Sequence, residues 1–326
     1  MQTTISIRSV FSQMAVVMVK RNESETSEVE LVRRIRRWAS PAPAASLVLG
    51  IGDDCAIYRP RGSREDLLFT TDLLIEDVHF RRATHRAEDV GWKCLARGLS
   101  DIAAMGGAPR FCLVSLTVPG WADTRWVNGF YRGLLRLAQR TGTALAGGDL
   151  ARTDKVTCDI VVCGAVPRGR ALRRDGARAG DAIYVSGRLG GSAMGLAQGS
   201  GAAWKRHLRP EPRLALGRFI REELRATAAM DLSDGLSLDL RRMCEASGLR
   251  AEIVIPPICL GGNLDQGLHG GEDYELLFTV PSRVRVPRAF EGLPLTRIGT
   301  MFRGKAEVEL YGRPLEALGW DHFAMS

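Results

Sequence analysis

Short acidic clusters that directly follow apolar stretches are the feature that most limits how this chain can fold. Aspartates flanked by glycine, serine or threonine occur in GIGDD (50–54), TTDLL (70–74), LSDIAAMGG (99–107), LAGGD (145–149) and MDLSDGLSLDL (230–240). Several of the apolar stretches are typical of β-strands, so their carboxylates stand at strand ends, where open α/β sheets bind ligands. The pattern predicts an α/β fold whose strands carry acidic side chains to one site.

Strand-like and helical stretches alternate along the chain. A helix is predicted from about residue 27, where Ser27 and Glu30 resemble a capping box. The other predicted helices cover 87–107, 124–142, 188–199 and 212–226, with one more from 237; the predicted strands cover 66–74, 111–119, 155–166, 182–187, 251–256, 272–280 and 306–312.

The turn-rich and arginine-rich stretch 167–181 is the best candidate boundary between two α/β units of about equal size. We therefore predict an N-terminal α/β domain over residues 27–166 and a C-terminal α/β domain over residues 167–326. Residues 1–26 are predicted to be a disordered extension or a mis-called start, because their short apolar patch is followed by NESETSE rather than by a cleavage site.

Composition excludes several classes of protein. The 326-residue chain carries a formal net charge of +8, and only five of its basic residues are lysines. Its arginines are scattered and its aromatic residues make up 6%, which argues against an RNA-binding module. No apolar run approaches the about 20 residues of a membrane-spanning helix. Seven cysteines without a CxxC pair indicate neither a disulfide framework nor a zinc site, and they fit a reducing cytoplasm.

Two glycine-rich stretches resemble phosphate-binding loops. GTMFRGK (299–305) matches the first part of a P-loop, but Ala306 stands where serine or threonine must hold magnesium, and a strand-like segment follows. A hairpin turn is the preferred interpretation. GRLGGSAMG (187–195) lies between a predicted strand and a predicted helix, so either phosphate binding or tight packing explains its glycines.

Each aspartate alone has an ordinary explanation, because aspartate is common in turns and at helix N-caps. Asp234 can cap the helix from 237, and Asp149 can turn the chain after two glycines. Asp101 differs, since it lies in a strongly helical stretch among small and apolar residues. An unpaired buried carboxylate is costly, so Asp101 is expected to have a partner.

Six aspartates that converge on one site require cations. Oxygen-only ligands suit Mg²⁺ or Mn²⁺ rather than zinc, and several hard cations in one site are what a polyphosphate needs. The five histidines show no metal-ligand spacing, and no serine-hydrolase elbow is present in the right context. The six residues are Asp54, Asp72, Asp101, Asp149, Asp231 and Asp234.

The motifs together resemble one family. They are GIGDDCAI, TTDLLIEDVHF, LSDIAAMGGAP, LAGGD, AMDLSDGLSLDL, GGEDYELLFTV and the terminal WDHFA. In this order, over about residues 27–326, they resemble the thiamine-monophosphate kinases of the aminoimidazole ribonucleotide synthetase (PurM-like) superfamily. The resemblance implies a cytoplasmic homodimer of two-domain PurM-like chains. It also implies direct in-line transfer of the ATP γ-phosphate to thiamine monophosphate at a multi-Mg²⁺ site, the last step of thiamine diphosphate biosynthesis.

The resemblance also assigns site residues. It implies an N-terminal domain that holds the metal and ATP site and dimerises. No general base is expected, because the acceptor is a phosphate oxygen that is largely ionised at pH 7. The implied metal ligands are Asp54, Thr70, Thr71, Asp72, Asp101, Asp149, Asp231 and Asp234; the implied ATP contacts are Gly148, Asp149, Arg174, Ser233 and Tyr131; and the residues implied to face thiamine monophosphate are His79, Glu272 and Trp320.

The chain departs from the family pattern at Leu150, at Asp77 and in a short segment before Gly270. These departures concern the substrate pocket more than metal binding. Two alternatives stay open. One is another enzyme of the superfamily, such as a selenophosphate synthetase, although no reactive cysteine stands in an N-terminal glycine-rich stretch. The other is a protein that binds RNA or nucleotide without catalysis.

Overall fold

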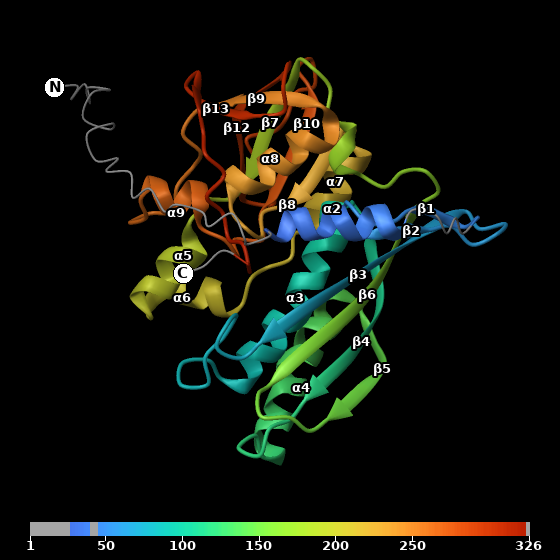
Figure 1. The fold of residues 1–326 in the computed structure, drawn as a ribbon, viewed down its shortest axis with the longest axis vertical. Coiled ribbons are helices and arrows are strands. Elements are labelled where there is room, and N and C mark those ends of the chain that lie inside the picture. The colour runs from blue at the N-terminus through green and yellow to red at the C-terminus, as the bar shows by residue number, and fades with distance from the viewer. Residues whose placement is uncertain (1–26, 40–44, 324–326) are drawn as a thin grey trace.

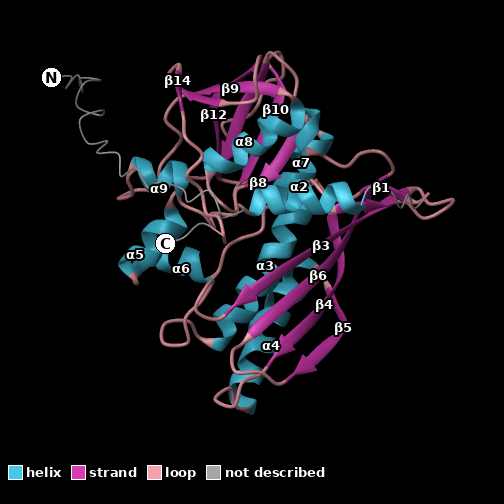
Figure 2. Ribbon diagram, viewed as in Figure 1, coloured by secondary structure: helices cyan, strands magenta, loops and turns pink. Residues whose placement is uncertain are grey.

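The computed structural model describes residues 27–39 and 45–323, and the predicted extension 1–26 lies outside them. The described residues form two sheets with their helices, one from each half of the chain (Figures 1 and 2). The N-terminal strand β6 ends at Pro167 and the C-terminal strand β7 begins at Asp181. The sheets therefore change within the stretch 167–181, although the division into two domains remains our proposal.

The N-terminal part is a six-stranded sheet backed by two helices, α3 (Ala87–Ala104) and α4 (Thr124–Thr141). In spatial order its strands are β1 (Leu47–Leu49), β2 (Ala56–Tyr58), β3 (Glu65–Ile75), β6 (Thr157–Pro167), β4 (Ala108–Thr117) and β5 (Ala144–Ala151). Burial alternates along β3, because successive side chains point to opposite faces: Leu68 and Thr70 are buried on the α3 side, and Thr71 and Leu73 are exposed. We call the exposed face of β3, β6 and β4 the outer face.

Helix α3 is the central element of the molecule. Of its 18 residues 15 are buried, so it is surrounded by other elements rather than packed on one side. It lies very close to α4: a Cβ added at Gly91 would be 1.9 Å from the Phe130 carbonyl oxygen, and one at Gly133 would be 1.9 Å from that of Glu88. Glycine is therefore required where these helices cross.

The C-terminal part is a second mixed sheet. Its spatial order is β14 (Arg313–Pro314), β13 (Val308–Leu310), β9 (Leu249–Ile253), β12 (Leu293–Arg303), β7 (Asp181–Ser186), β10 (Leu276–Pro281) and β8 (Ala228–Asp231), and β11 (Ala289–Phe290) pairs with β12. Its helical elements are η1 (Arg174–Gly176), α5 (Gly191–Gln198), α6 (Gly201–Leu208), α7 (Leu214–Glu222), α8 (Leu236–Ser247) and α9 (Leu264–His269). The first helix, α2 (Glu28–Ala39), contacts α8 through an ion pair between Arg33 and Glu245.

The two parts meet along α3. Its C-terminal half contacts α7 and β8, and Ser100 in α3 donates a hydrogen bond of 2.6 Å to Asp231 at the end of β8. One apolar cluster surrounds α3 and β6 and a second fills the C-terminal sheet, whereas a third joins Ala103 and Ala104 of α3 to α7 and β10. The end of β8 therefore lies against the C-terminal half of α3.

Most predicted elements are present, with two corrections. The stretch 299–305 lies in β12 and the turn after it, but this turn is not a hairpin, because β9 lies between β12 and β13. Asp149 does not turn the chain: it lies within β5, a strand that the sequence analysis did not predict. Within the described ranges, no helix combines the length and the apolar character that crossing a membrane demands.

Candidate functional site

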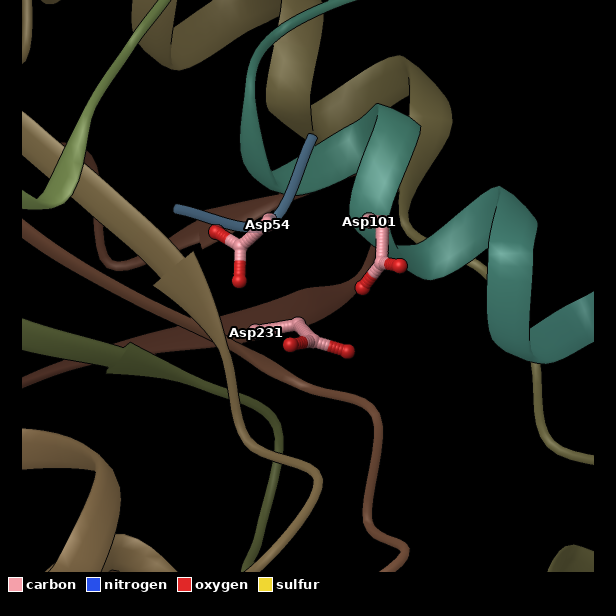
Figure 3. Close-up of side chains that lie close together, drawn as sticks. All are labelled: Asp54, Asp101 and Asp231. Atoms are coloured by element: carbon pink, nitrogen blue, oxygen red, sulfur yellow. The ribbon is translucent and has the colours of Figure 1, made fainter. Parts of the chain in front are cut away.

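Three carboxylates converge where the two parts of the chain meet. Asp54 follows β1, Asp101 lies in α3, and Asp231 ends β8; one oxygen of each lies within 4.8 Å of the others (Figure 3). Asp54 and Asp231 are 8% and 2% exposed. We call these three residues the carboxylate cluster. It joins residues that are far apart in the sequence, as the acidic motifs predicted.

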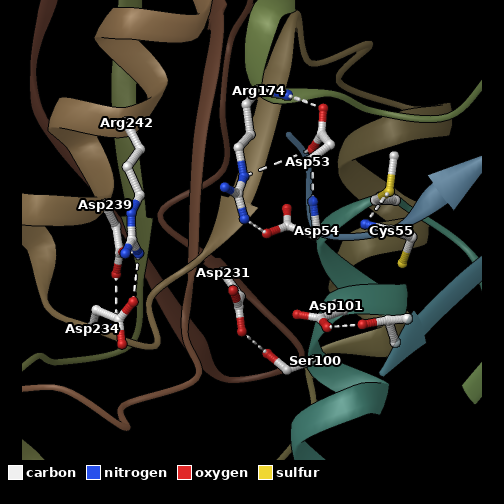
Figure 4. Close-up of polar contacts among 12 residues, drawn as sticks. Asp53, Asp54, Cys55, Ser100, Asp101, Arg174, Asp231, Asp234, Asp239 and Arg242 are labelled. Carbon is white, nitrogen blue, oxygen red and sulfur yellow. Dashed lines mark hydrogen bonds and ion pairs between the residues drawn. The ribbon is translucent and has the colours of Figure 1, made fainter. Parts of the chain in front are cut away.

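Each member of the cluster is held by a neighbour (Figure 4). The Thr70 hydroxyl on β3 donates to Asp101, so Asp101 has the partner that its helical position required. The Ser100 hydroxyl holds Asp231, and the Arg174 guanidinium pairs with one oxygen of Asp54. The carboxylate oxygens are therefore fixed but only partly neutralised, since in the described ranges Asp54 is the one member with an ion pair.

The cluster has too much negative charge for its burial. Burial, and then the neighbouring carboxylates, raise the pKa of Asp101 and Asp231 well above the usual range, and burial raises that of Asp54 despite Arg174. The second carboxylate oxygen of Asp54 is buried and has no hydrogen-bond partner. Three carboxylates with hard oxygen atoms, a buried Asp54 oxygen without a hydrogen-bond partner, and excess negative charge together fit divalent cations such as Mg²⁺.

Asp72 lies beside the cluster on the α3 side of β3. Its carboxylate pairs with Arg97 at 3.1 Å, and its charge is among the causes that raise the pKa of Asp101. The structure therefore places Thr70 and Asp72 beside the cluster, and their role as metal ligands stays a prediction.

The turn after β8 contains a second acidic group. Arg242 bridges Asp234 at 2.5 Å and Asp239 at 3.0 Å. Asp239 also accepts the backbone N–H groups of Asp234 and Gly235, so it is Asp239, not Asp234, that satisfies donors at the start of α8. Ser233 lies in the same turn, and its carbonyl accepts the Glu272 N–H at 2.7 Å.

Two predicted metal ligands lie on the outer face, away from the cluster. Thr71 donates to Asp159 at 2.6 Å, and Asp149 on β5 pairs in register with Ser115 on that face. Gly148 precedes Asp149, and a Cβ there would be 1.8 Å from the Val114 carbonyl oxygen. Neighbouring residues of a strand point to opposite faces, so Thr70 and Thr71 cannot both reach one site in one chain.

Tyr131 lies apart from the cluster as well. Its ring packs edge-on against Phe130 at 5.4 Å within the apolar core around α4. Burial raises its pKa. Its predicted nucleotide contact stays a prediction.

The three residues predicted to face the acceptor form another group, which we call the acceptor-side group. His79 lies between β3 and α3, Glu272 before β10, and Trp320 near the end of the described chain. The His79 and His322 rings are 5.1 Å apart, and the His322 and Trp320 rings are 5.7 Å apart. The structure thus brings His79 and Trp320 together through His322.

Glu272 carries a negative charge in a buried setting. Burial raises its pKa, but neighbouring groups, Lys93 first, outweigh burial and lower it. Burial lowers the pKa of His79 to about 3 and that of His207 to about 4, so both imidazoles are neutral at pH 7. The acceptor side therefore offers one carboxylate, neutral rings and an aromatic face.

Several residues of the site were not predicted from the sequence. Asp53 accepts the Arg174 N–H at 3.1 Å, and burial raises its pKa to about 7. Ser100 directly precedes Asp101, and Asp53 directly precedes Asp54. Their position next to predicted metal ligands was the sequence signal that could have identified them. Lys93 was a lone lysine among apolar residues of a predicted helix, and that was its signal.

The glycine-rich stretch 187–195 leads from β7 into α5, as predicted, but two of its N–H groups already donate to a carboxylate. The Asp273 carboxylate accepts from Gly190 N at 2.5 Å and Ser192 N at 3.1 Å. An internal carboxylate thus stands where a phosphate would bind, so close packing explains these glycines.

Comparison with known proteins agrees with this arrangement. Two family models match: AIR synthase related protein, N-terminal domain, over residues 52–166, and AIR synthase related protein, C-terminal domain, over residues 178–311. The thiamine-monophosphate kinase of Bacillus subtilis is 36% identical, with 86% of this chain and 94% of that protein covered. The one from Escherichia coli K12 is 38% identical, with 85% and 92% covered. The chain belongs to the thiamine-monophosphate kinase family.

Solved structures confirm the PurM-like fold. A structure described as AaThiL complexed with AMPPCP and TMP matches with a TM-score of 0.80 at 31% identity, covering 99% of this chain and 100% of that one. The hydrogenase maturation protein HypE in complex with ATP matches with a TM-score of 0.63 at 19% identity, which shows a shared fold alone.

The three departures from the family pattern can be located in the structure. Asp77 has a φ of 67°, in the left-handed region where glycine is favoured, and its side chain pairs with Lys155 at 2.9 Å on the surface. Leu150 is 63% exposed on the edge strand β5. The segment before Gly270 contains only the short helix α9, whose start is a capping box of Asn263 and Gln266.

Proposed function

We propose that this protein transfers the γ-phosphate of ATP in line to thiamine monophosphate, giving thiamine diphosphate and ADP. The observation that carries the proposal is the carboxylate cluster, whose negative charge Arg174 compensates only in part. Arg97 links it to the acceptor-side group, because Arg97 pairs with Asp72 and acts on the charge of Glu272. The named relatives act on thiamine monophosphate, and the AaThiL structure holds AMPPCP and TMP.

Asp54, Asp101 and Asp231, with Thr70 and Asp72 beside them, would hold the Mg²⁺ ions. Bound Mg²⁺ offsets phosphate charge and orients the transferring group. Around it, Ser100 and Thr70 fix the carboxylate oxygens, so that little reorganisation is needed when the nucleotide arrives.

Arg174 and Ser233 are the predicted nucleotide contacts nearest the cluster. Arg174 holds Asp54 and lies within 3.8 Å of Asp53, so its cation stands at the cluster edge where a polyphosphate would arrive. On the acceptor side, the Trp320 face suits a cationic thiazolium or a pyrimidine ring, and Glu272 adds a negative charge. No residue needs to act as a general base, because the attacking phosphate oxygen is already ionised.

We also propose a homodimer formed through the outer face. Leu73 and Leu113 are 45% and 37% exposed there. Asp149, a predicted metal ligand and ATP contact, lies on the same face. If a second copy covered this face, Asp149 would lie at the interface between the two chains. The proposed compartment remains the cytoplasm, since all seven cysteines are free thiols and six of them are buried.

The test is a product assay with the purified protein, ATP, Mg²⁺ and thiamine monophosphate, with and without EDTA. Thiamine diphosphate should form one-for-one with ADP, and EDTA should abolish it. Binding of Mg-ATP without any thiamine diphosphate would overturn the proposed acceptor but leave the metal site standing. ADP formation that EDTA does not affect would overturn the metal site.

A further inference from the structure

We propose that Lys93 is a positioning residue for the phosphate acceptor: from the middle of α3 it holds both Glu272 and the His79 loop in place. This inference rests on the proposed function and deepens it. Lys93 touches no residue of the carboxylate cluster among the contacts of the described chain, so its effect should fall on the acceptor and not on ATP.

The burial of Lys93 is energetically costly. Its side chain is 1% exposed, and lysine is almost never buried so completely unless it is paired. A methionine-like apolar residue would fill the same space in a helix surrounded by apolar neighbours at lower cost. The charge is therefore retained for what it contacts.

Lys93 contacts two members of the acceptor-side group at once. Its ammonium lies 2.8 Å from the Glu272 carboxylate, and it donates a hydrogen bond of 3.3 Å to the His79 carbonyl oxygen. One buried cation thus connects a loop of the N-terminal part to the segment before β10 of the C-terminal part. These two segments are far apart in the sequence and are joined in space by Lys93.

Glu272 needs this support because its backbone is unusual. Its φ is 62°, in the left-handed region that non-glycine residues rarely adopt. Its N–H is fixed by the Ser233 carbonyl, and its second carboxylate oxygen lies 3.4 Å from His207 Nδ1. Since burial keeps His207 neutral at pH 7, Lys93 is the cation in direct contact with the Glu272 carboxylate among the described residues, and it keeps the carboxylate in this orientation.

The experiment compares Lys93→Met, Glu272→Gln and the double variant by steady-state kinetics with each substrate varied. Lys93→Met should raise the KM for thiamine monophosphate about tenfold or more and leave the KM for ATP within about twofold. Lys305→Met is the matched control, because Lys305 is exposed in the turn after β12; it should change neither constant.

The double variant separates positioning from general stability. If Lys93 acts through Glu272, the double variant should bind thiamine monophosphate as Glu272→Gln does, because the second change removes nothing further. A still higher KM in the double variant would show that the contact with the His79 loop contributes in its own right. An equal rise of both KM values in Lys93→Met would overturn the inference. If Lys93→Met alone does not fold, the double variant carries the test, since it leaves no unpaired buried charge.

The wild-type assay keeps this inference distinct from the proposed function. Wild-type protein that makes no thiamine diphosphate would refute the proposed function and the inference with it. Wild-type activity with an unchanged acceptor KM in Lys93→Met would refute the inference alone.

Discussion

At the scale of single residues, Asp101 is the side chain whose charge can be removed with least effect on shape. Asn can still accept the Thr70 hydroxyl hydrogen bond, and the loss of one of three neighbouring negative charges relieves repulsion. We expect Asp101→Asn to keep or raise the melting temperature. Changes to residues that only support metal ligands cost about 10- to 100-fold in activity, and Asp101→Asn should reduce Mg²⁺-dependent transfer by more than that. Thermal melts and the product assay measure the two effects.

Asp154→Asn is the matched control for Asp101→Asn. Asp154 is exposed in the turn before β6, so the same chemical change should leave both stability and turnover near the wild-type values. Near-normal turnover in Asp101→Asn would refute the role of the cluster in metal binding.

Sequence reasoning found the acidic residues but not the faces they occupy. Asp101 was recognised because a carboxylate among apolar helical residues needs a partner. Thr71 and Asp149 were grouped with it by motif alone, and a shift of one residue along a strand moves a side chain to the other face. Lys93 was missed, because a lone lysine in a predicted helix also fits a solvated surface.

At the scale of elements, the outer face of β3, β6 and β4 supports a specific prediction about assembly. Leu113 lies on this face between the buried Cys112 and Val114, and it pairs in register with Val161. A charge buried at an apolar interface is costly when it has no partner. We expect Leu113→Asp to convert the proposed dimer into a monomer, as measured by light scattering.

The control introduces the same charge on the helical side of the sheet. Leu135 on α4 is 45% exposed, so Leu135→Asp should keep the mass of the wild-type assembly. A dimeric Leu113→Asp protein would place the interface elsewhere, and a monomeric wild-type protein would refute the homodimer.

Elements with a continuous apolar periodicity could be predicted from the sequence. Elements whose conformation depends on pairing with a neighbouring strand could not. The long helix α3 and the strands β3 and β6 were predicted to within a few residues, because their apolar periodicity is continuous. Strand β5 was missed, since its sequence ALAGGDLA has small and glycine residues that favour turns. Its pairing with β4 determines its conformation.

At the scale of the whole molecule, the site exists only because two sheets meet along α3. The hydrogen bond from Ser100 to Asp231 spans 131 positions, and that from Arg174 to Asp54 spans 120. Motif spacing does not encode such distances. The alternation of strands and helices predicted two α/β units, but which unit supplies each carboxylate became evident only from their contact.

That convergence links the stability of the molecule to pH and metal. Burial raises the pKa of Asp53 and of Asp239 to about 7, and neighbouring carboxylates shift in the same direction, whereas the unfolded chain has pKa values near 3.8. Between these values the carboxylates bind more protons in the folded, metal-free protein than in the unfolded chain, so their contribution to the free energy of unfolding falls as the pH rises. The buried imidazoles of His79 and His207 act in the opposite direction, but only up to about pH 6.5, where the histidines of the unfolded chain lose their protons. Without metal, we therefore expect the melting temperature to be lower at about pH 8 than at about pH 7, above the range in which the histidines titrate.

Mg²⁺ should reverse this trend, because it binds the ionised carboxylates of the folded state only. The Mg²⁺-induced rise in melting temperature should be larger at about pH 8 than at about pH 5, with about 2–4 °C for each kcal/mol of binding free energy. Thermal melts in Mg²⁺ and in EDTA, at matched ionic strength, measure both quantities. Asp231→Asn should shrink the difference between the two pH values, because one charge of the cluster is gone. Equal Mg²⁺ shifts at both pH values would mean that the carboxylates near the cluster do not titrate with the metal.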